Sequence, residues 1–236
     1  MVVDTRTRSN EPELMDDFAL EGEILRDALD KIASINKLLG GNKVTLDGVK
    51  TLINSQHDEE ISILDVGCGN GDMLRTLADY GRAKQLKFKL IGIDANAFTI
   101  RHAESLSENY TNITYQCIDI FTDAFKTTSF DIILCTLTLH HFKDHEILAL
   151  MKSFHQQTKL GVVINDLHRS KLAYYLFNAI CFVFRLNEMS RKDGLVSILR
   201  GFKRADLAQY STELKFKSYS IRWRWAFRYQ WVIKSI

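Results

Sequence analysis

Hydrophobic and polar positions divide the chain into a helical N-terminal part and an alternating part that begins near residue 61. Residues 1–15 are polar and contain the only proline, Pro12, so we expect a mobile arm there. Apolar side chains then recur at helical spacing, which predicts two helices: one that begins at Asp16 or Asp17 and stops at Gly40-Gly41, and a short one over about 45–54.

From Ile61 onward, short apolar runs alternate with helical stretches, a pattern typical of βα units and a mostly parallel sheet. The predicted strands occupy residues 61–66, 89–94, 113–117, 130–136 and 160–166, and the predicted helices between them occupy 72–81, 97–108 and 144–158. Residues 216–223 and 228–236 are rich in aromatic and β-branched side chains, which predicts a terminal antiparallel hairpin. The helical residues before this hairpin would cover the strand ends.

Composition and charge narrow the class of protein. With 236 residues, of which 46% are hydrophobic and 25% charged, the chain fits one globular domain with a helical extension and excludes a repeat array. Its net charge of +2 does not favour a nucleic-acid partner. The charge is uneven, however, because residues 1–60 carry a net −6 and residues 191–236 a net +8, which keeps a polyanionic partner open.

Cysteines and apolar segments exclude further classes. The four cysteines are separated by 49, 18 and 46 positions and lack the spacing of metal ligands, so we expect neither a metal site nor a disulfide framework. No signal sequence is visible, which favours a cytoplasmic protein. The most apolar run, Leu172–Phe184, is shorter than a membrane span and predicts a buried helix, although its face is also a candidate for peripheral membrane contact.

The strongest chemical signal is a glycine loop at the end of the first predicted strand. Gly67, Gly69 and Gly71 let the backbone turn tightly and approach a ligand at the positive end of the following helix. A dinucleotide fingerprint would place its third glycine at position 72, where this chain has an aspartate that would repel a pyrophosphate. The loop therefore suits a ligand with an amino-acid end, namely S-adenosylmethionine.

Together with this loop, two later acidic residues make the sequence resemble the class I S-adenosylmethionine-dependent methyltransferases, and more narrowly the ubiquinone/menaquinone-biosynthesis methyltransferases. Asp65–Gly71 matches the family's first motif. The resemblance implies that Asp94 accepts hydrogen bonds from both ribose hydroxyls of the cofactor, as one carboxylate can. It also implies that Asp119 accepts from the adenine amino group. The expected contacts with S-adenosylmethionine are Asp65, Gly67, Cys68, Gly69, Gly71, Asp94, Ala95, Asp119, Ile120 and Cys135.

The resemblance implies an α/β fold with a Rossmann-like, doubly wound sheet, N-terminal helices and a helical lid. We expect residues 1–58 to form an arm and helices that cover the substrate, with a polar linker over 55–60. Residues 59–236 would form the methyltransferase domain, interrupted by a lid at about 168–206. The oligomeric state cannot be predicted from the sequence.

Methyl transfer to a hydroxyl requires a base, and histidine is suited to that role near neutral pH. Three histidines follow predicted strands: His140, His141 and His168. We prefer His168 as the base, with Asp166 either orienting it or binding substrate. His141 fits a packing role slightly better, because similar His-His-Phe triplets are widespread in the family.

Differences from related methyltransferases indicate which methyl acceptor this chain would take. A single proline excludes the proline-containing motif of the adenine-N6 and glutamine-amide methyltransferases. The aromatic run Tyr174–Phe184 fits either a lid over a flat apolar acceptor or simple helix core. Arg191 and Arg200 would clamp an acidic substrate group or solvate a helix face. We therefore predict methylation, at a hydroxyl, of a small aromatic or polyketide-like acceptor that is phenolic or quinone-like.

Two alternatives remain at this point. The first is an RNA methyltransferase, because Trp223, Trp225, Tyr229 and Trp231 alternate with Arg222, Arg224 and Arg228. We favour a strand with the aromatic residues in the core and the arginines in solvent, which argues against a nucleic-acid partner. The second alternative is a protein that binds S-adenosylmethionine without catalysing transfer.

Overall fold

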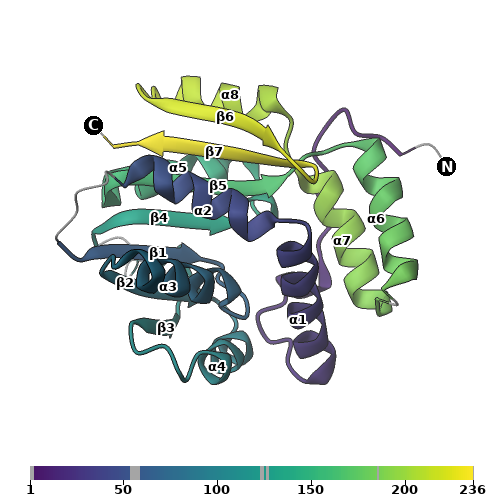
Figure 1. The fold of residues 1–236 in the computed structure, drawn as a ribbon. Helices are drawn as coiled ribbons and strands as arrows, with labels where there is room; N and C mark the ends of the chain where they lie inside the picture. Colours follow the sequence, from purple (N-terminus) through teal and green to yellow (C-terminus); the bar gives the residue numbers. More distant parts are fainter. Residues whose placement is uncertain (1–2, 54–58, 123–124, 126–127, 185, 236) are drawn as a thin grey trace.

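A seven-stranded sheet forms the centre of the computed structural model, which describes residues 3–53, 59–122, 125, 128–184 and 186–235 (Figure 1). The strand order is β3-β2-β1-β4-β5-β7-β6. The first five strands run parallel, and β7 and β6 are antiparallel. The strands are β1 (Ile61–Val66), β2 (Phe88–Asp94), β3 (Ile113–Cys117), β4 (Phe130–Thr136), β5 (Thr158–Leu167), β6 (Tyr219–Arg224) and β7 (Arg228–Lys234).

Helices cover both faces of this sheet. One face packs against α2 (Gly41–Leu52), α3 (Asp72–Lys84) and α4 (Ala97–Leu106), and the other against α5 (Asp144–Gln157) and α8 (Arg204–Glu213). Successive side chains of β1 enter opposite cores, with Ile63 on the α3 side and Leu64 on the α5 side. Burial on both faces explains why these strands appear as continuous apolar runs in the sequence. The observed topology confirms the predicted α/β fold with a doubly wound sheet and a C-terminal hairpin.

A third group of helices stands at the end of the sheet toward which the parallel strands point (Figure 1). It consists of α1 (Glu23–Leu38), α6 (Lys171–Val183) and α7 (Glu188–Arg200). The short 3₁₀ turns η1 (Leu14–Asp16) and η3 (Leu139–His141) lie at the same end, in contact with α7. This arrangement places helices over the loops that follow the strands, which is where ligands bind in open α/β sheets.

The N-terminal helices begin at other residues than the pattern predicts. The first helix starts after Gly22, because Asp16 ends a 3₁₀ turn and uses its carboxylate elsewhere in the fold. The second helix starts at Gly41, earlier than predicted. Only Gly40 leaves the helical conformation (φ 75°), so the break between the two helices is short. Residues 54–58 lie outside the described residues. They include most of the predicted linker and the expected boundary before the methyltransferase domain at residue 59.

The prediction of a mobile N-terminal arm is wrong for the described residues. The backbone N–H of Ser9 donates to the carbonyl of Leu199 in α7, at 3.0 Å. Arg8 Nη2 donates to the carbonyls of His140 and Phe142, each at 3.0 Å. These partners lie more than half the chain away, so the polar composition of the segment could not indicate them. We call residues 3–16 the N-terminal strap.

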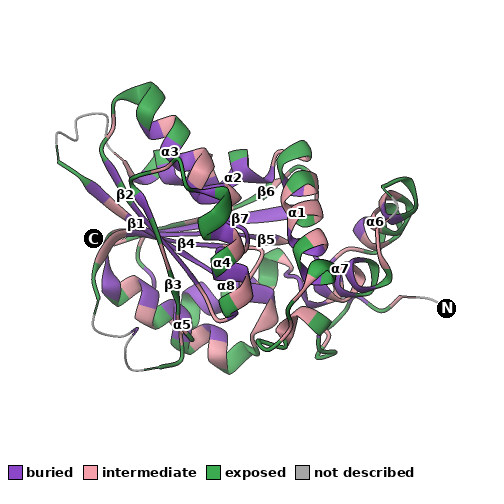
Figure 2. Ribbon diagram, turned by 90° about the horizontal axis from the view of Figure 1, so that it is seen from below, coloured by how far each residue is buried: buried purple, intermediate pink, exposed green. Residues whose placement is uncertain are grey.

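The expectation that the apolar run Leu172–Phe184 forms a buried helix is also wrong. Only Ala173 and Cys181 of α6 are buried, whereas Phe182 is 88% exposed and Val183 73% exposed. Figure 2 shows much of α6 in green. The reason is that α6 packs mainly against α7, which leaves its outer face without a neighbour among the described residues. No described helix has the length and hydropathy needed to cross a membrane.

The C-terminal hairpin departs from the predicted alternation of buried aromatics and exposed arginines. Tyr229 and Trp231 are buried as expected, but Trp223 and Trp225 are exposed and Arg228 is only 4% exposed. The cause is the place of β7 between β5 and β6, which buries every residue from 228 to 233. A sequence pattern does not reveal which strand of a hairpin becomes the inner one.

The two-sided core leads to a prediction about stability. Phe154 is fully buried under the sheet, so Phe154→Ala should lower the free energy of unfolding by about 3–5 kcal/mol. Urea denaturation followed by circular dichroism measures this loss. The matched control is Phe182→Ala in the exposed face of α6, which should change stability by less than about 0.5 kcal/mol. Equal losses in the two variants would contradict the assignment of α6 as an uncovered helix.

Candidate functional site

A cavity of about 970 Å³ lies at the carboxyl ends of the parallel strands. The loops after β1, β2, β3, β4 and β5 form its floor, and residues of α1, α6, α7 and the N-terminal strap form its walls. All of the predicted site residues except Gly71 and Cys135 line it. The topology therefore brings most of the predicted cofactor residues and all three candidate histidines to one cavity.

The glycine loop has the backbone conformation that its sequence predicts. Gly67, Gly69 and Gly71 have φ angles of 68°, 53° and 78°, in the left-handed region that favours glycine. A Cβ at Gly67 would lie 2.4 Å from the side chain of Thr138, so a side chain there would also clash. Gly71 itself does not line the cavity and instead caps the N-terminus of α3.

Asp94 lies directly beside this loop. Its Oδ2 accepts a hydrogen bond from the backbone N–H of Gly69 at 3.3 Å, and its Oδ1 accepts from that of Asn96 at 3.0 Å. Burial raises the pKa of Asp94 above its usual range, although these hydrogen bonds oppose that effect. Leu29 of α1 packs 3.9 Å from the position of a Cβ on Gly69, so α1 covers the loop.

The remaining predicted cofactor residues fall into two groups. Ala95, Asp119 and Ile120 line the cavity beyond Asp94, with Asp119 exposed and its Oδ1 accepting from the N–H of Phe121 at 2.9 Å. Cys68 also lines the cavity. Cys135 does not, because its side chain points into the core beneath α5, so the geometry offers no cavity contact for its thiol. Burial raises the pKa of both thiols well above the usual value, which keeps them protonated.

Asp65 is a buried carboxyl group on the cavity floor. It is 2% exposed, and its Oδ1 has no hydrogen-bond partner in the described structure. Burial first, and then the neighbouring carboxylates of Asp72 and Asp94, raise its pKa well above the usual value. A cationic group bound above the loop would relieve this repulsion.

The structure pairs Asp166 with His140, not with His168 as the sequence suggested. Asp166 Oδ1 lies 2.7 Å from His140 Nδ1, and Oδ2 accepts from the backbone N–H of His140 at 3.1 Å. Both side chains are 2% exposed. The suggestion that Asp166 orients His168 is therefore wrong, because η3 turns His140 back over the carboxyl end of β5.

His141 forms a second histidine–carboxylate pair. Its Nδ1 lies 2.5 Å from Asp16 Oδ1, and its ring stacks at a tilt on that of His140 with 4.3 Å between centroids. A carboxylate at Nδ1 fixes the proton on that nitrogen and leaves the lone pair of Nε2 free in the neutral ring. The side chain of His141 keeps 24% of its surface exposed, unlike that of His140.

His168 has the opposite arrangement. Its Nδ1 accepts a hydrogen bond from the indole N–H of Trp223 at 3.2 Å, which places the ring proton on Nε2. Burial and the nearby cations Lys203 and Arg169 lower its pKa. Its one free lone pair is thus already engaged, so this geometry does not favour the role that the sequence suggested.

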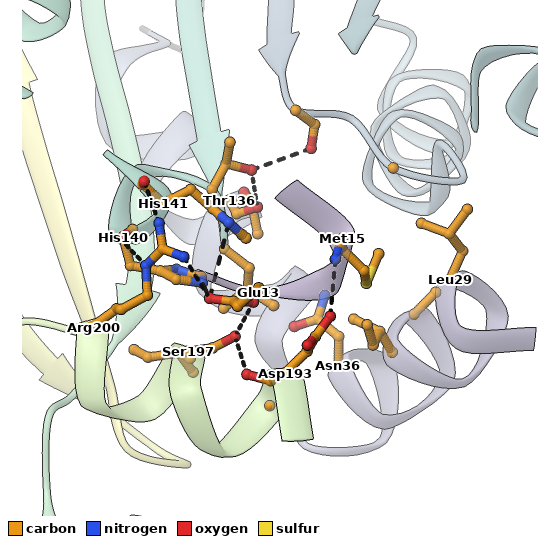
Figure 3. A pocket seen from close by; sticks show the side chains of 18 of the residues that line it. Glu13, Met15, Leu29, Asn36, Thr136, His140, His141, Asp193, Ser197 and Arg200 are labelled. Atoms are coloured by element: carbon orange, nitrogen blue, oxygen red, sulfur yellow. Dashed lines mark hydrogen bonds and ion pairs between the residues drawn. The ribbon is translucent and has the colours of Figure 1, made fainter. Parts of the chain in front are cut away.

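Glu13 (Figure 3) and Asp16 also belong to this site, although no pattern in the sequence indicates either role. The N-terminal strap carries both to Arg200 of α7, whose Nη1 lies 2.7 Å from Asp16 Oδ2 and 3.5 Å from Glu13 Oε1. Arg200 also donates to the carbonyls of His140 and His141. Its guanidinium neither clamps a substrate nor solvates a helix face, as we had considered, because protein acceptors occupy it.

Three residues of this cluster could hold a metal ion, although cysteine and histidine spacing predicted no such site. One ligand atom each of Glu13, His140 and His141 lies within 4.8 Å of the others. Glu13 Oε1 is 3.7 Å from His140 Nε2 and 3.9 Å from His141 Nδ1. An ion there would have to displace Asp16 from His141 and would lie close to the Arg200 cation. The cluster is therefore better explained as a network of ion pairs.

Comparison with known proteins gives a consistent assignment. Residues 63–161 match the family described as a methyltransferase domain. A ubiquinone biosynthesis O-methyltransferase of Glaesserella parasuis is 34% identical over 127 residues, which cover 48% of each chain. That of Coxiella burnetii is 36% identical over 83 residues, 35% of this chain and 33% of the relative. The chain spans about half the length, or less, of these curated relatives.

Solved structures share the fold at low sequence identity. The plantazolicin methyltransferase BpumL, solved with SAH, has a TM-score of 0.66 and 15% identity, and the alignment covers 90% of this chain and 94% of that one. The magnesium protoporphyrin IX methyltransferase of Synechocystis PCC 6803, solved with SAM, has a TM-score of 0.55 and 14% identity, with coverages of 93% and 89%. Residues 63–161, which contain the glycine loop and the strands β2 to β4, are therefore a methyltransferase domain of the class I S-adenosylmethionine-dependent type.

Proposed function

We propose that this protein transfers a methyl group from S-adenosylmethionine to a hydroxyl of a small aromatic or polyketide-like acceptor, phenolic or quinone-like, bound in the cavity. The names of the curated relatives, ubiquinone biosynthesis O-methyltransferases, support O-methylation. The observation that carries the proposal is a histidine–carboxylate pair, His141 with Asp16, in the wall of the cavity that also contains the glycine loop.

The cofactor would lie across the carboxyl ends of β1, β2 and β3. Asp94 would accept hydrogen bonds from the ribose hydroxyls, and Asp119 from the adenine amino group, with Ala95 and Ile120 beside the ring. Gly67 and Gly69 would carry the amino-acid end on their backbone. The sulfonium supplies an activated methyl group, so the protein has to orient the acceptor and exclude water.

His141 is the base that the geometry supports best. Its Nε2 lone pair would take the hydroxyl proton as the oxygen attacks the methyl carbon, and Asp16 would stabilise the imidazolium that forms. His140 lines the cavity but is only 2% exposed, so it presents less surface to an acceptor than His141 does, and His168 has its lone pair engaged by Trp223. Both remain candidates only if the acceptor rearranges these contacts.

The acceptor would occupy the part of the cavity between His141 and the helical lid. Phe177 of α6, Trp225 and Phe227 line the cavity with aromatic surface, which suits a flat apolar molecule. The strap and helices of residues 1–58 would cover the substrate, and residues 168–206 would act as the lid. These roles follow from the elements that wall the cavity.

The cofactor site predicts the effect of Asp94→Ala. Without this carboxylate the ribose hydroxyls lose their acceptor, so the affinity for S-adenosylhomocysteine should fall about tenfold or more, ~1.4 kcal/mol. Isothermal titration calorimetry on wild type and variant measures the change. The control is Asp79→Ala on the outer surface of α3, which should bind as wild type does. A wild type that binds no S-adenosylhomocysteine would refute the proposed function.

The base assignment predicts different effects for two histidine variants. With an acceptor drawn from a panel of phenols and hydroxyquinones, His141→Asn should lower kcat by about 10²–10⁴-fold while S-adenosylhomocysteine still binds. His168→Asn is the matched control and should keep kcat within a few-fold. A larger loss in His168→Asn than in His141→Asn would restore the sequence-based choice of base. Turnover on RNA and on none of the phenols would reject the acceptor class.

A further inference from the structure

The cavity contains one buried cation that the site described so far does not use. Arg228 begins β7, pairs with Leu167 across the sheet, and is 4% exposed. It lines the cavity, and its Nε and Nη1 atoms are buried without a hydrogen-bond partner in the described structure. Among the described residues, no carboxylate forms an ion pair of 4.0 Å or less with Arg228, and Asp166 and Asp72 favour its charge from a greater distance.

An unpaired buried charge is costly, so its presence needs a physical reason. Burial lowers the pKa of Arg228 to about 10, which still leaves the guanidinium charged at neutral pH. Loss of the proton therefore does not remove the cost. The other buried arginines of the molecule, Arg169 and Arg200, each hydrogen-bond to carbonyls and a carboxylate. Arg228 differs in that its Nε and Nη1 atoms have no hydrogen-bond partner in the described structure.

The surroundings of Arg228 indicate what kind of partner would suit it. Arg228 and Asn36 both lie beside Gly41. A Cβ built on Gly41 would lie 3.1 Å from Arg228 Cζ and 1.8 Å from Asn36 Oδ1. Asn36 Oδ1 is buried without a partner, as is Asp65 Oδ1 on the cavity floor. This end of the cavity therefore offers an unpaired cation together with unpaired acceptors. A zwitterion with one carboxylate and one ammonium group complements both.

We propose that Arg228 binds the carboxylate of the amino-acid end of S-adenosylmethionine, while Asp65 on the floor of the same cavity receives the ammonium group. This inference rests on the proposed function and adds an anchor from the C-terminal strand to a site otherwise built on the β1, β2 and β3 loops. A guanidinium donates charge-assisted hydrogen bonds to a carboxylate, which are among the strongest in proteins. Binding would thus give the guanidinium of Arg228 an oppositely charged partner.

The test compares S-adenosylhomocysteine with 5′-methylthioadenosine, which keeps the adenosine and the thioether but lacks the amino-acid end. Titration calorimetry on Arg228→Gln should show about tenfold or greater weakening for S-adenosylhomocysteine, ~1.4 kcal/mol, and unchanged binding of 5′-methylthioadenosine. Arg228→Lys should recover part of the loss, because it keeps the charge. Arg222→Gln, exposed on the same hairpin, is the matched control.

The outcomes separate this inference from the proposed function. Asp94→Ala should weaken both ligands alike, because both contain the ribose, whereas Arg228→Gln should affect only one. If Arg228→Gln leaves S-adenosylhomocysteine binding unchanged, or weakens both ligands equally, the inference fails and the proposed function stands. If wild type binds neither ligand, the proposed function fails. A thermal melt without ligand shows that Arg228→Gln is folded, since removal of an unpaired buried charge should not lower Tm.

Discussion

A single buried cation, the guanidinium of Arg200, holds together the end of the molecule where the acceptor would bind. It joins the N-terminal strap, α7 and η3, because it donates to Asp16, approaches Glu13 and binds the carbonyls of His140 and His141. Burial opposes the charge on Asp16, yet hydrogen bonds from His141 and Arg200 hold its pKa well below the usual range. Asp16 therefore stays ionised and can orient His141.

Arg200 and Arg228 show how the same residue type serves two purposes in one cavity. Both are less than a tenth exposed. Arg200 donates its hydrogen bonds to protein acceptors, and these bonds fix the positions of the strap and the histidines. Arg228 keeps buried donors without a partner, which a protein tolerates at the site of an anionic ligand. Satisfaction of hydrogen bonds, more than burial, distinguishes the structural arginine from the ligand-binding one.

The parts of the fold that the sequence predicted are those with local signals. The βα alternation from Ile61 onward places β1, β3 and β4 at the residues expected, and the glycine loop has the positive φ angles that its composition requires. The N-terminal strap and α6 were misjudged for the same reason. Polar composition indicated mobility for the first and apolar composition indicated burial for the second, but each outcome depended on whether a distant element packed against the segment.

The sequence by itself therefore determined the doubly wound sheet, the resemblance to methyltransferases and the strand ends at which a cofactor would lie, because each rests on spacing along consecutive βα units. Only the tertiary structure decided which carboxylate each of His140 and His141 meets and which arginine remains unpaired. His141 meets Asp16 across 125 positions, and Arg200 meets Asp16 across 184. Pairing over such separations depends on how the strap and helices fold back over the sheet, and no local pattern encodes that geometry.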